Sequence, residues 1–219
     1  MSFRQKQGFS LVELLTVMGV IATLLVVSAA WVGRTGDAES RRAARSLILG
    51  ALNYARTAAL SSGEPVAMVM MPYERGQEGQ LGRAFAVFEV NQDEATGSYS
   101  AERQLKRWQE LPGRMIFTKG SPVASGGQNA FDQNPILSVQ VKNPDSGLTS
   151  EVTMPAIVFG ATGSVAWPGG GGELELHLGE GTVKTGVVMA ASADTNDWRK
   201  HEVFVVGRQT GRVRYLRTE

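Results

Sequence analysis

The sequence has no cysteine, so no disulfide bond can stabilise any part of its 219 residues. It has only two histidines, His177 and His201, and neither lies in a spacing such as H-E-x-x-H that would bring two ligands to one zinc ion. It also lacks a charge excess, because 22 lysines and arginines are offset by 21 aspartates and glutamates, for a net charge of +1. Proteins that bind nucleic acid over a broad surface are usually basic, so this balance argues against such a partner.

Motifs of catalysis and cofactor binding are absent as well. The sequence around Ser164 is not G-x-S-x-G, and the glycines from Gly169 to Gly172 are not followed by the lysine and hydroxyl residue of a phosphate-binding loop. The acidic stretches 91–94 and 194–197 begin like calcium loops, but each lacks the glycine at position six and the glutamate at position twelve. We predict polar turns there, with no metal site, no cofactor and no enzymatic activity.

The strongest feature that is present is an apolar segment close to the N-terminus. From Phe9 to Val32 the chain has 24 residues with a single charge, that of Glu13. A helix of this length is about 36 Å long and can cross a hydrocarbon core of roughly 30 Å. Arg4 and Lys6 precede it, so the positive-inside tendency predicts a cytoplasmic N-terminus and an exported remainder. A carboxylate within the segment costs about 2.5 kcal/mol or more at its centre, so Glu13 needs a partner.

An ordinary secretory signal peptide is one interpretation, with Ser28, Ala29 and Ala30 as small residues for cleavage. The apolar run is longer than such signals have, and an acidic residue near its start is unusual. Cleavage after Gly8 explains more. The new amine of Phe9 would lie one helical turn from the Glu13 carboxylate, and the two charges could neutralise each other within one chain or between adjacent chains.

The order G-F-S-L-V-E, from Gly8 to Glu13, followed by an apolar helix resembles the class III leader of type IV pilins and type II secretion pseudopilins. In that family a prepilin peptidase cuts after the glycine and methylates the new phenylalanine. The resemblance therefore implies cleavage between Gly8 and Phe9, N-methylation of Phe9, and an assembly role for Glu13.

The same resemblance implies partners and a location. The partners are prepilin peptidase, other pilin or pseudopilin subunits, an inner-membrane assembly platform and membrane lipid. The balanced charge, and not the resemblance, argues against nucleic acid as a partner. The location is a single pass through the inner (cytoplasmic) membrane, with the N-terminus cytoplasmic and the globular domain periplasmic or extracellular, and then a filament after assembly. Whether the machine is a secretion system, a pilus or a DNA-uptake apparatus is left open.

Helical periodicity continues beyond the apolar segment. Two glycines in 33–37 predict a loosening, since each weakens a helix by about 1 kcal/mol relative to alanine. From Ala38 to Leu60 apolar residues recur every three or four positions, which predicts a helix with one core-facing stripe. Gly63 and Pro65 predict its end. The stripe contains Ala44, Leu47, Ile48, Ala51, Leu52, Ala55, Ala58 and Ala59.

Short apolar runs separated by turn residues follow Pro65, a pattern typical of an antiparallel sheet. Trp108, Trp167 and Trp198 are expected to be packing residues. Glycine-rich loops are predicted at 76–82, 120–128 and 169–172. The predicted strands are 66–71, 83–90, 103–109, 114–118, 136–141, 156–159, 164–167, 173–178, 183–189, 203–207 and 212–216.

Three further segments are similar to the GspH/FimT group of minor pseudopilins: Leu52–Ala59, Ile157–Gly163 and Gly211–Arg214. The chain departs from that group by insertions around Gly76 and from Gly120 to Ser150. The last hairpin carries a basic cluster that can form a local phosphate-binding patch. A solvated strand face is the simpler interpretation, and DNA contact is the alternative. The cluster consists of Arg208, Arg212, Arg214 and Arg217.

Together these features predict an α+β, pilin-like chain, in which a long N-terminal helix packs by its second half on a C-terminal antiparallel β domain. The predicted parts are a leader (1–8), a transmembrane and assembly helix (9–32), its amphipathic continuation (33–63) and an exported β-rich domain (64–219). The predicted function is that of a non-catalytic minor pilin or pseudopilin. The alternatives are a DNA-binding pilin for DNA uptake and a secreted or membrane-anchored β protein with an ordinary signal peptide.

Overall fold

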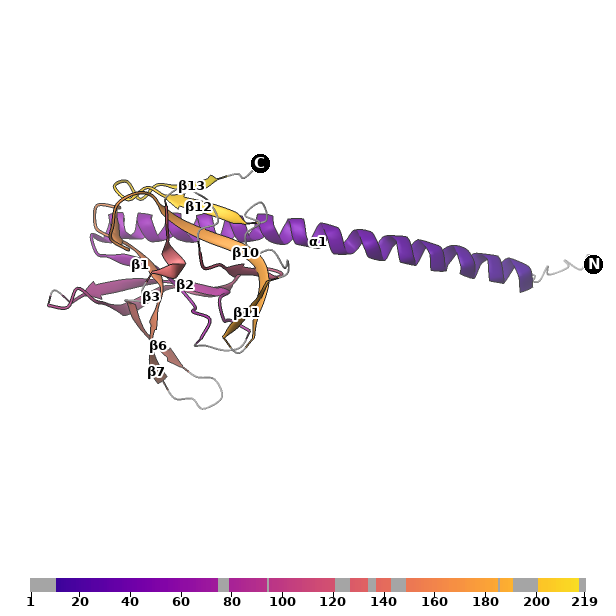
Figure 1. Cartoon of the computed structure of the whole chain (residues 1–219), viewed down its shortest axis with the longest axis horizontal. Helices are drawn as coiled ribbons and strands as arrows, with labels where there is room; N and C mark the ends of the chain where they lie inside the picture. Colours follow the sequence, from indigo (N-terminus) through magenta and orange to yellow (C-terminus); the bar gives the residue numbers. More distant parts are fainter. Residues whose placement is uncertain are drawn as a thin grey trace, which may run out of the picture. The chain divides into compact units, whose positions relative to one another are not determined.

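The computed structural model describes residues 11–74, 79–93, 95–120, 127–133, 137–142, 149–184, 186–190 and 201–216. The side chains at 13, 25–37, 141, 142, 149, 189 and 190 lie outside that description. The chain divides into two compact units, residues 1–39 and residues 40–219 (Figure 1).

The described elements are one long helix followed by strands. In chain order they are α1 (Leu11–Ser62), β1 (Val66–Met70), β2 (Ala84–Gln92), β3 (Tyr99–Glu110), β4 (Met115–Phe117), β5 (Gln128–Asn129), the 3-10 turn η1 (Ala130–Asp132), β6 (Leu137–Lys142), β7 (Thr149–Met154), β8 (Ala156–Phe159), β9 (Val165–Trp167), β10 (Leu174–Lys184), β11 (Val187–Ala190), β12 (Glu202–Val206) and β13 (Val213–Leu216).

Helix α1 ends where the sequence predicts. Gly63 follows Ser62 with a φ of 74°, and its amide donates a 3.0 Å hydrogen bond to the carbonyl of Ala59. The predicted loosening at 33–37 is not seen, because helix is assigned throughout α1. Two glycines weaken a helix without ending it, because a glycine keeps the backbone N–H that a proline lacks.

The apolar stripe of the second half of α1 is confirmed as core. Its fully buried members are Ala44, Ile48, Ala51, Leu52, Ala55 and Ala59, while Leu47 and Ala58 are partly buried against the same core. A stripe of this spacing brings one face of the helix onto a sheet and leaves the other in water.

Among the described residues the strands form two sheets. The first has seven strands in the order β7-β6-β3-β2-β1-β8-β9, and the second has six, with β11-β10-β12-β13 in line and β4 and β5 pairing with β10. The predicted antiparallel arrangement holds for all described pairings except β3 with β6 and β5 with β10, which are parallel. The main core lies between α1 and the inner faces of the two sheets.

The central strands of the first sheet are buried on both faces. In β1, Val66, Met68 and Met70 join the core beneath α1. The intervening residues Ala67 and Val69 join a second apolar cluster, as expected when successive side chains of a strand point to opposite faces. The β6–β7 hairpin contributes Leu137, Val139, Val152 and Met154 to that second cluster. This hairpin therefore packs against the face of the first sheet that points away from α1.

One strand prediction was wrong, and two strands were not predicted. The segment 183–189 is not one strand, because Gly186 adopts a φ of 80° and turns the chain from β10 into β11. Strand β5 was missed because it has only two residues. Strand β7, which pairs with β6, was missed because its many polar residues obscure the alternation of apolar and polar side chains that indicates a strand.

Candidate functional site

The three residues that the leader resemblance singles out cannot be placed by their side chains. Gly8 and Phe9 lie outside the described residues, and only the backbone of Glu13 is described, within the first turn of α1. Cleavage at Gly8, methylation of Phe9 and an assembly role for Glu13 therefore stay predictions.

The segment Leu11–Leu24 of α1, which we call the apolar head, is exposed on every side. Its large apolar side chains have exposed fractions from 49% to 78%. They occupy positions 11, 12, 14, 15, 17, 18, 20, 21 and 24, and at 100° per residue these positions surround the helix. A helix that is apolar all round is normally buried in lipid or among other helices, so the apolar head is an interaction surface.

The two threonine hydroxyls of the apolar head are satisfied within the helix. The Thr16 hydroxyl donates to the Val12 carbonyl at 2.8 Å, and the Thr23 hydroxyl donates to the Val20 carbonyl at 2.8 Å. These bonds let both threonines enter an apolar environment without an unpaired hydroxyl.

Among the residues described in full, no helix is long and apolar enough to cross a membrane. The predicted span from Phe9 to Val32 lies partly outside those residues, at 9, 10, 13 and 25–32.

The basic cluster of the last hairpin does not form one free patch. The Arg208 guanidinium donates to the carbonyls of Pro168 and Gly172, the latter at 2.9 Å, and to the side-chain oxygen of Gln128. Burial lowers the pKa of Arg208, as expected for a group that has given up water for these acceptors. Arg208 therefore fastens the 168–172 loop.

The other arginines of the cluster differ from one another. Arg214 is exposed and pairs with both carboxylate oxygens of Glu173, one of them at 2.6 Å. Arg212 is exposed, and Arg217 lies outside the described residues. Of the described members, Arg214 lies on β13, whereas Arg208 and Arg212 lie in the turn between β12 and β13, so the cluster is not a single strand face. DNA contact by this cluster stays a prediction.

The two histidines lie in different surroundings. His177 is fully buried on β10, with its Nε2 atom 2.8 Å from Glu175 Oε2. His201 precedes β12, and its Nδ1 atom is 3.4 Å from the Thr118 hydroxyl. In the described part of the chain no group of three or more potential ligands could hold a metal ion.

The predicted polar turn after β2 is seen at Asp93. Its carboxylate accepts hydrogen bonds from the Ala95 amide at 3.0 Å and the Thr96 hydroxyl at 2.7 Å. These bonds lower the pKa of Asp93, and the bond from the Thr96 hydroxyl has the larger effect. The carboxylate is thus used to close a β-turn.

Trp108 and Trp167 are packing residues, as predicted. Both are partly buried against the second apolar cluster, and the Trp108 ring meets Phe88 edge-on at 6.1 Å. Trp198 lies outside the described residues.

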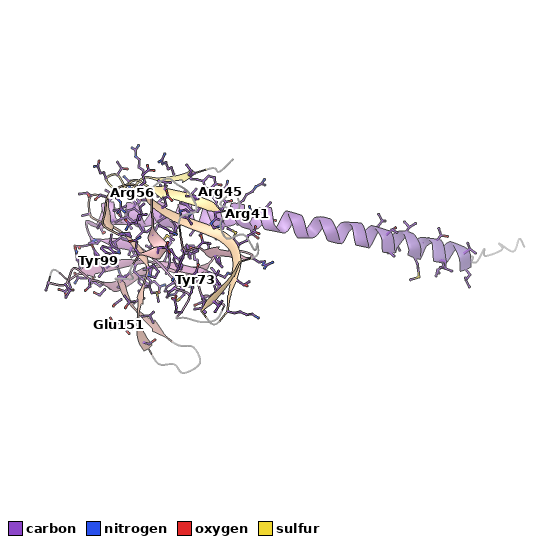
Figure 2. All side chains as sticks on the ribbon, viewed as in Figure 1. Arg41, Arg45, Arg56, Tyr73, Tyr99 and Glu151 are labelled. Carbon is purple, nitrogen blue, oxygen red and sulfur yellow. The ribbon has the colours of Figure 1, made fainter. Side chains whose placement is uncertain are left out.

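The three GspH/FimT-like segments come together in space, at a place we call the glycine junction (Arg56, Leu60, Gly163 and Gly211). A Cβ atom on Gly211 would lie 1.9 Å from the Gly163 carbonyl oxygen, and one on Gly163 would lie 2.9 Å from Leu60. Arg56, labelled in Figure 2, donates from Nε a 2.7 Å hydrogen bond to the Thr210 carbonyl. The motif residues therefore join the end of α1 to the β8–β9 turn and the β12–β13 turn.

Both the N-terminal segment and a longer part of the chain match known proteins. Residues 3–29 match the sequence profile of the prokaryotic N-terminal methylation motif. Type II secretion system protein H of Xanthomonas campestris pv. campestris is 30% identical over 128 residues, which cover 57% of this chain and 70% of that protein. The chain belongs to the type II secretion system protein H family. It therefore carries a prepilin-type N-terminus on a minor pseudopilin, and neither the DNA-uptake interpretation nor the signal-peptide interpretation is favoured.

Two solved structures are similar at lower identity. The type IV minor pilin FimU of Pseudomonas aeruginosa is 15% identical, with a TM-score of 0.40 over 81% of this chain and 88% of that one. The minor pseudopilin EpsH from the type II secretion system of Vibrio cholerae is also 15% identical, with a TM-score of 0.41 over 82% and 96% of the two chains.

Proposed function

We propose that this chain is a structural, non-catalytic subunit of a type II secretion pseudopilus. The observation that carries the proposal is the apolar head of α1, exposed on all sides and directly preceded by a methylation-type leader. Such a helix needs lipid before assembly and other subunits' helices after it. Family membership supports the same role, since the 30% identical relative is named as a type II secretion system protein.

The proposed life of the subunit follows from the leader. Prepilin peptidase cuts between Gly8 and Phe9 at the cytoplasmic face and methylates Phe9. The segment 9–32 holds the processed chain in the inner membrane, with the N-terminus in the cytoplasm and the β-rich domain in the periplasm. An assembly platform then moves the subunit from the membrane into the filament.

Glu13 is proposed to position the subunit in the filament. A carboxylate among packed apolar helices is tolerable only when an ammonium group neutralises it, either its own N-terminus or that of a chain already in place. A subunit at the extreme tip of the filament has no earlier subunit whose N-terminal ammonium group could neutralise its Glu13 carboxylate. We therefore place this subunit beneath another one, near the tip rather than at it.

The test is association of the Glu13→Leu variant with its neighbouring subunit, measured by co-purification from detergent. The variant should still be inserted in the membrane and cleaved. About tenfold less of the neighbouring subunit should co-purify with it, because the carboxylate that pairs with the neighbour's N-terminal amine is gone. Glu39→Leu is the matched control, since Glu39 is an exposed carboxylate on the same helix. Association unchanged in Glu13→Leu would refute the docking role of Glu13.

A further inference from the structure

The globular unit begins at Ser40, and its first helical turns carry two arginines that bind the second sheet. Arg45 donates from Nε at 3.1 Å and from Nη2 at 2.9 Å to the same carboxylate oxygen of Glu202 on β12. The Glu202 side chain is only 7% exposed. The Arg45 guanidinium also stacks on the Tyr215 ring of β13, with its central carbon 3.9 Å from the ring centroid.

The second arginine repeats the arrangement one turn earlier. Arg41 reaches Glu180 on β10 with an Nε to Oε1 distance of 2.6 Å, and both side chains are partly buried. Arg41 and Arg45 are four residues apart and share one face of α1.

The two carboxylates are matched to that spacing. Glu202 lies opposite Leu178 in the β10–β12 ladder, and Glu180 is two residues beyond Leu178. Opposed and alternate residues of a sheet share a face, so both carboxylates are presented on the inner face. Figure 2 shows Arg41 and Arg45 following one another along α1 in the globular unit.

A close backbone approach adds a third contact at the same place. Gly113, before β4, has a φ of 61°, and a Cβ atom there would lie 2.5 Å from the Ser40 hydroxyl oxygen. Farther along α1 the buried contacts are apolar, at Ile48, Ala51, Leu52 and Ala55. In the described part of α1 the ion pairs with the second sheet are thus gathered at Arg41 and Arg45, while the Arg56 hydrogen bond to the Thr210 carbonyl lies near the far end of the helix.

We propose that the Arg41–Glu180 and Arg45–Glu202 pairs form a clamp that transmits tension from α1 to strands β10 and β12. The inference rests on the proposed function, because a subunit that is moved from the membrane into a filament and held there by its N-terminal helix bears load through that helix. Apolar contacts alone offer little directional resistance to a helix that is peeled from its end. Two ion pairs at that end resist the first step of peeling, because separating a shielded pair leaves a charge without its partner.

Amide hydrogen exchange in the full-length processed protein in detergent tests the clamp without any filament. Glu202→Gln should raise exchange about tenfold or more in residues 40–48, by local opening, and leave 51–59 within about twofold. Arg45→Lys keeps the charge but loses the forked contact, so its effect should be smaller. Glu173→Gln is the matched control, because it breaks an exposed ion pair of the same sheet that does not involve α1. Unchanged exchange in 40–48, or an equal rise in both segments, would overturn the clamp.

Single-molecule pulling tests the transmission of tension. With handles at the two chain ends, Glu202→Gln should lower the force of the first opening event, and Glu180→Gln at the less buried pair should lower it by a smaller amount. An unchanged first opening force in both variants would contradict the proposal. Neither experiment needs assembly, so failure of the proposed function would appear in where the mature chain begins, measured by intact mass, and would leave these results standing.

Discussion

At the scale of single residues, two glycines of the family-like motifs are explained by how closely their segments meet. Gly211 has a φ of 59° and Gly163 a φ of 73°, a region that side-chain-bearing residues enter only with strain. The amide of Gly211 also donates to the Gly207 carbonyl at 2.6 Å, which closes the turn between β12 and β13. The close approach of the two segments therefore accounts for glycine at both positions.

Gly211→Ala should lower the free energy of unfolding by about 2 to 4 kcal/mol, combining backbone strain with overlap on the Gly163 carbonyl. Gly97→Ala is the control. Gly97 has a similar φ of 69° but no atom within 4 Å of an added Cβ, so its cost should be about 1 kcal/mol. Chemical denaturation of both variants measures the difference. Equal losses would mean that the Gly163 contact does not constrain the junction.

At the scale of elements, local patterns predicted the helix and most of the strands. The three-and-four spacing of the Ala44–Ala59 stripe was sufficient to predict the buried face, because the residues of one helix face recur within a single continuous stretch of chain. The last hairpin was predicted for the same reason, with β12 and β13 separated by a short glycine-containing turn.

What the sequence could not supply was long-range pairing. The parallel contact of β3 with β6 involves only Tyr99–Leu137 and Ser100–Ser138, and no local pattern encodes it. The partners of Arg41 and Arg45 lie 139 and 157 residues away, so helical spacing suggested only a polar face. The Glu175–His177 pair was equally hidden, because β-strand alternation alone does not say which polar face will be buried.

The last hairpin should bind DNA weakly. Gel shifts of residues 33–219 at low and moderate salt should give little binding, since Arg208 and Arg214 are already engaged and the region beyond Val32 has equal numbers of acidic and basic residues. Arg212→Ala with Arg214→Ala should change nothing, as should Arg107→Ala on exposed β3. Tight binding abolished only by the hairpin variant would favour DNA uptake instead.

At the scale of the whole molecule, the chain combines two surfaces of opposite kind. Residues 40–219 bury their apolar side chains in two clusters, whereas the apolar head presents its own on every side. The globular unit of such a subunit covers its own apolar side chains, whereas the apolar head needs lipid or other helices to cover it.

The most direct test of the proposed function is the intact mass of the protein purified from membranes of cells that contain prepilin peptidase. The mass should correspond to a chain that begins at Phe9 with one added methyl group, and Gly8 replaced by a bulky residue should leave an unprocessed membrane protein that does not assemble. A mature chain that begins at Ser2, or one cut after Ala30, would contradict the assignment as a pseudopilin.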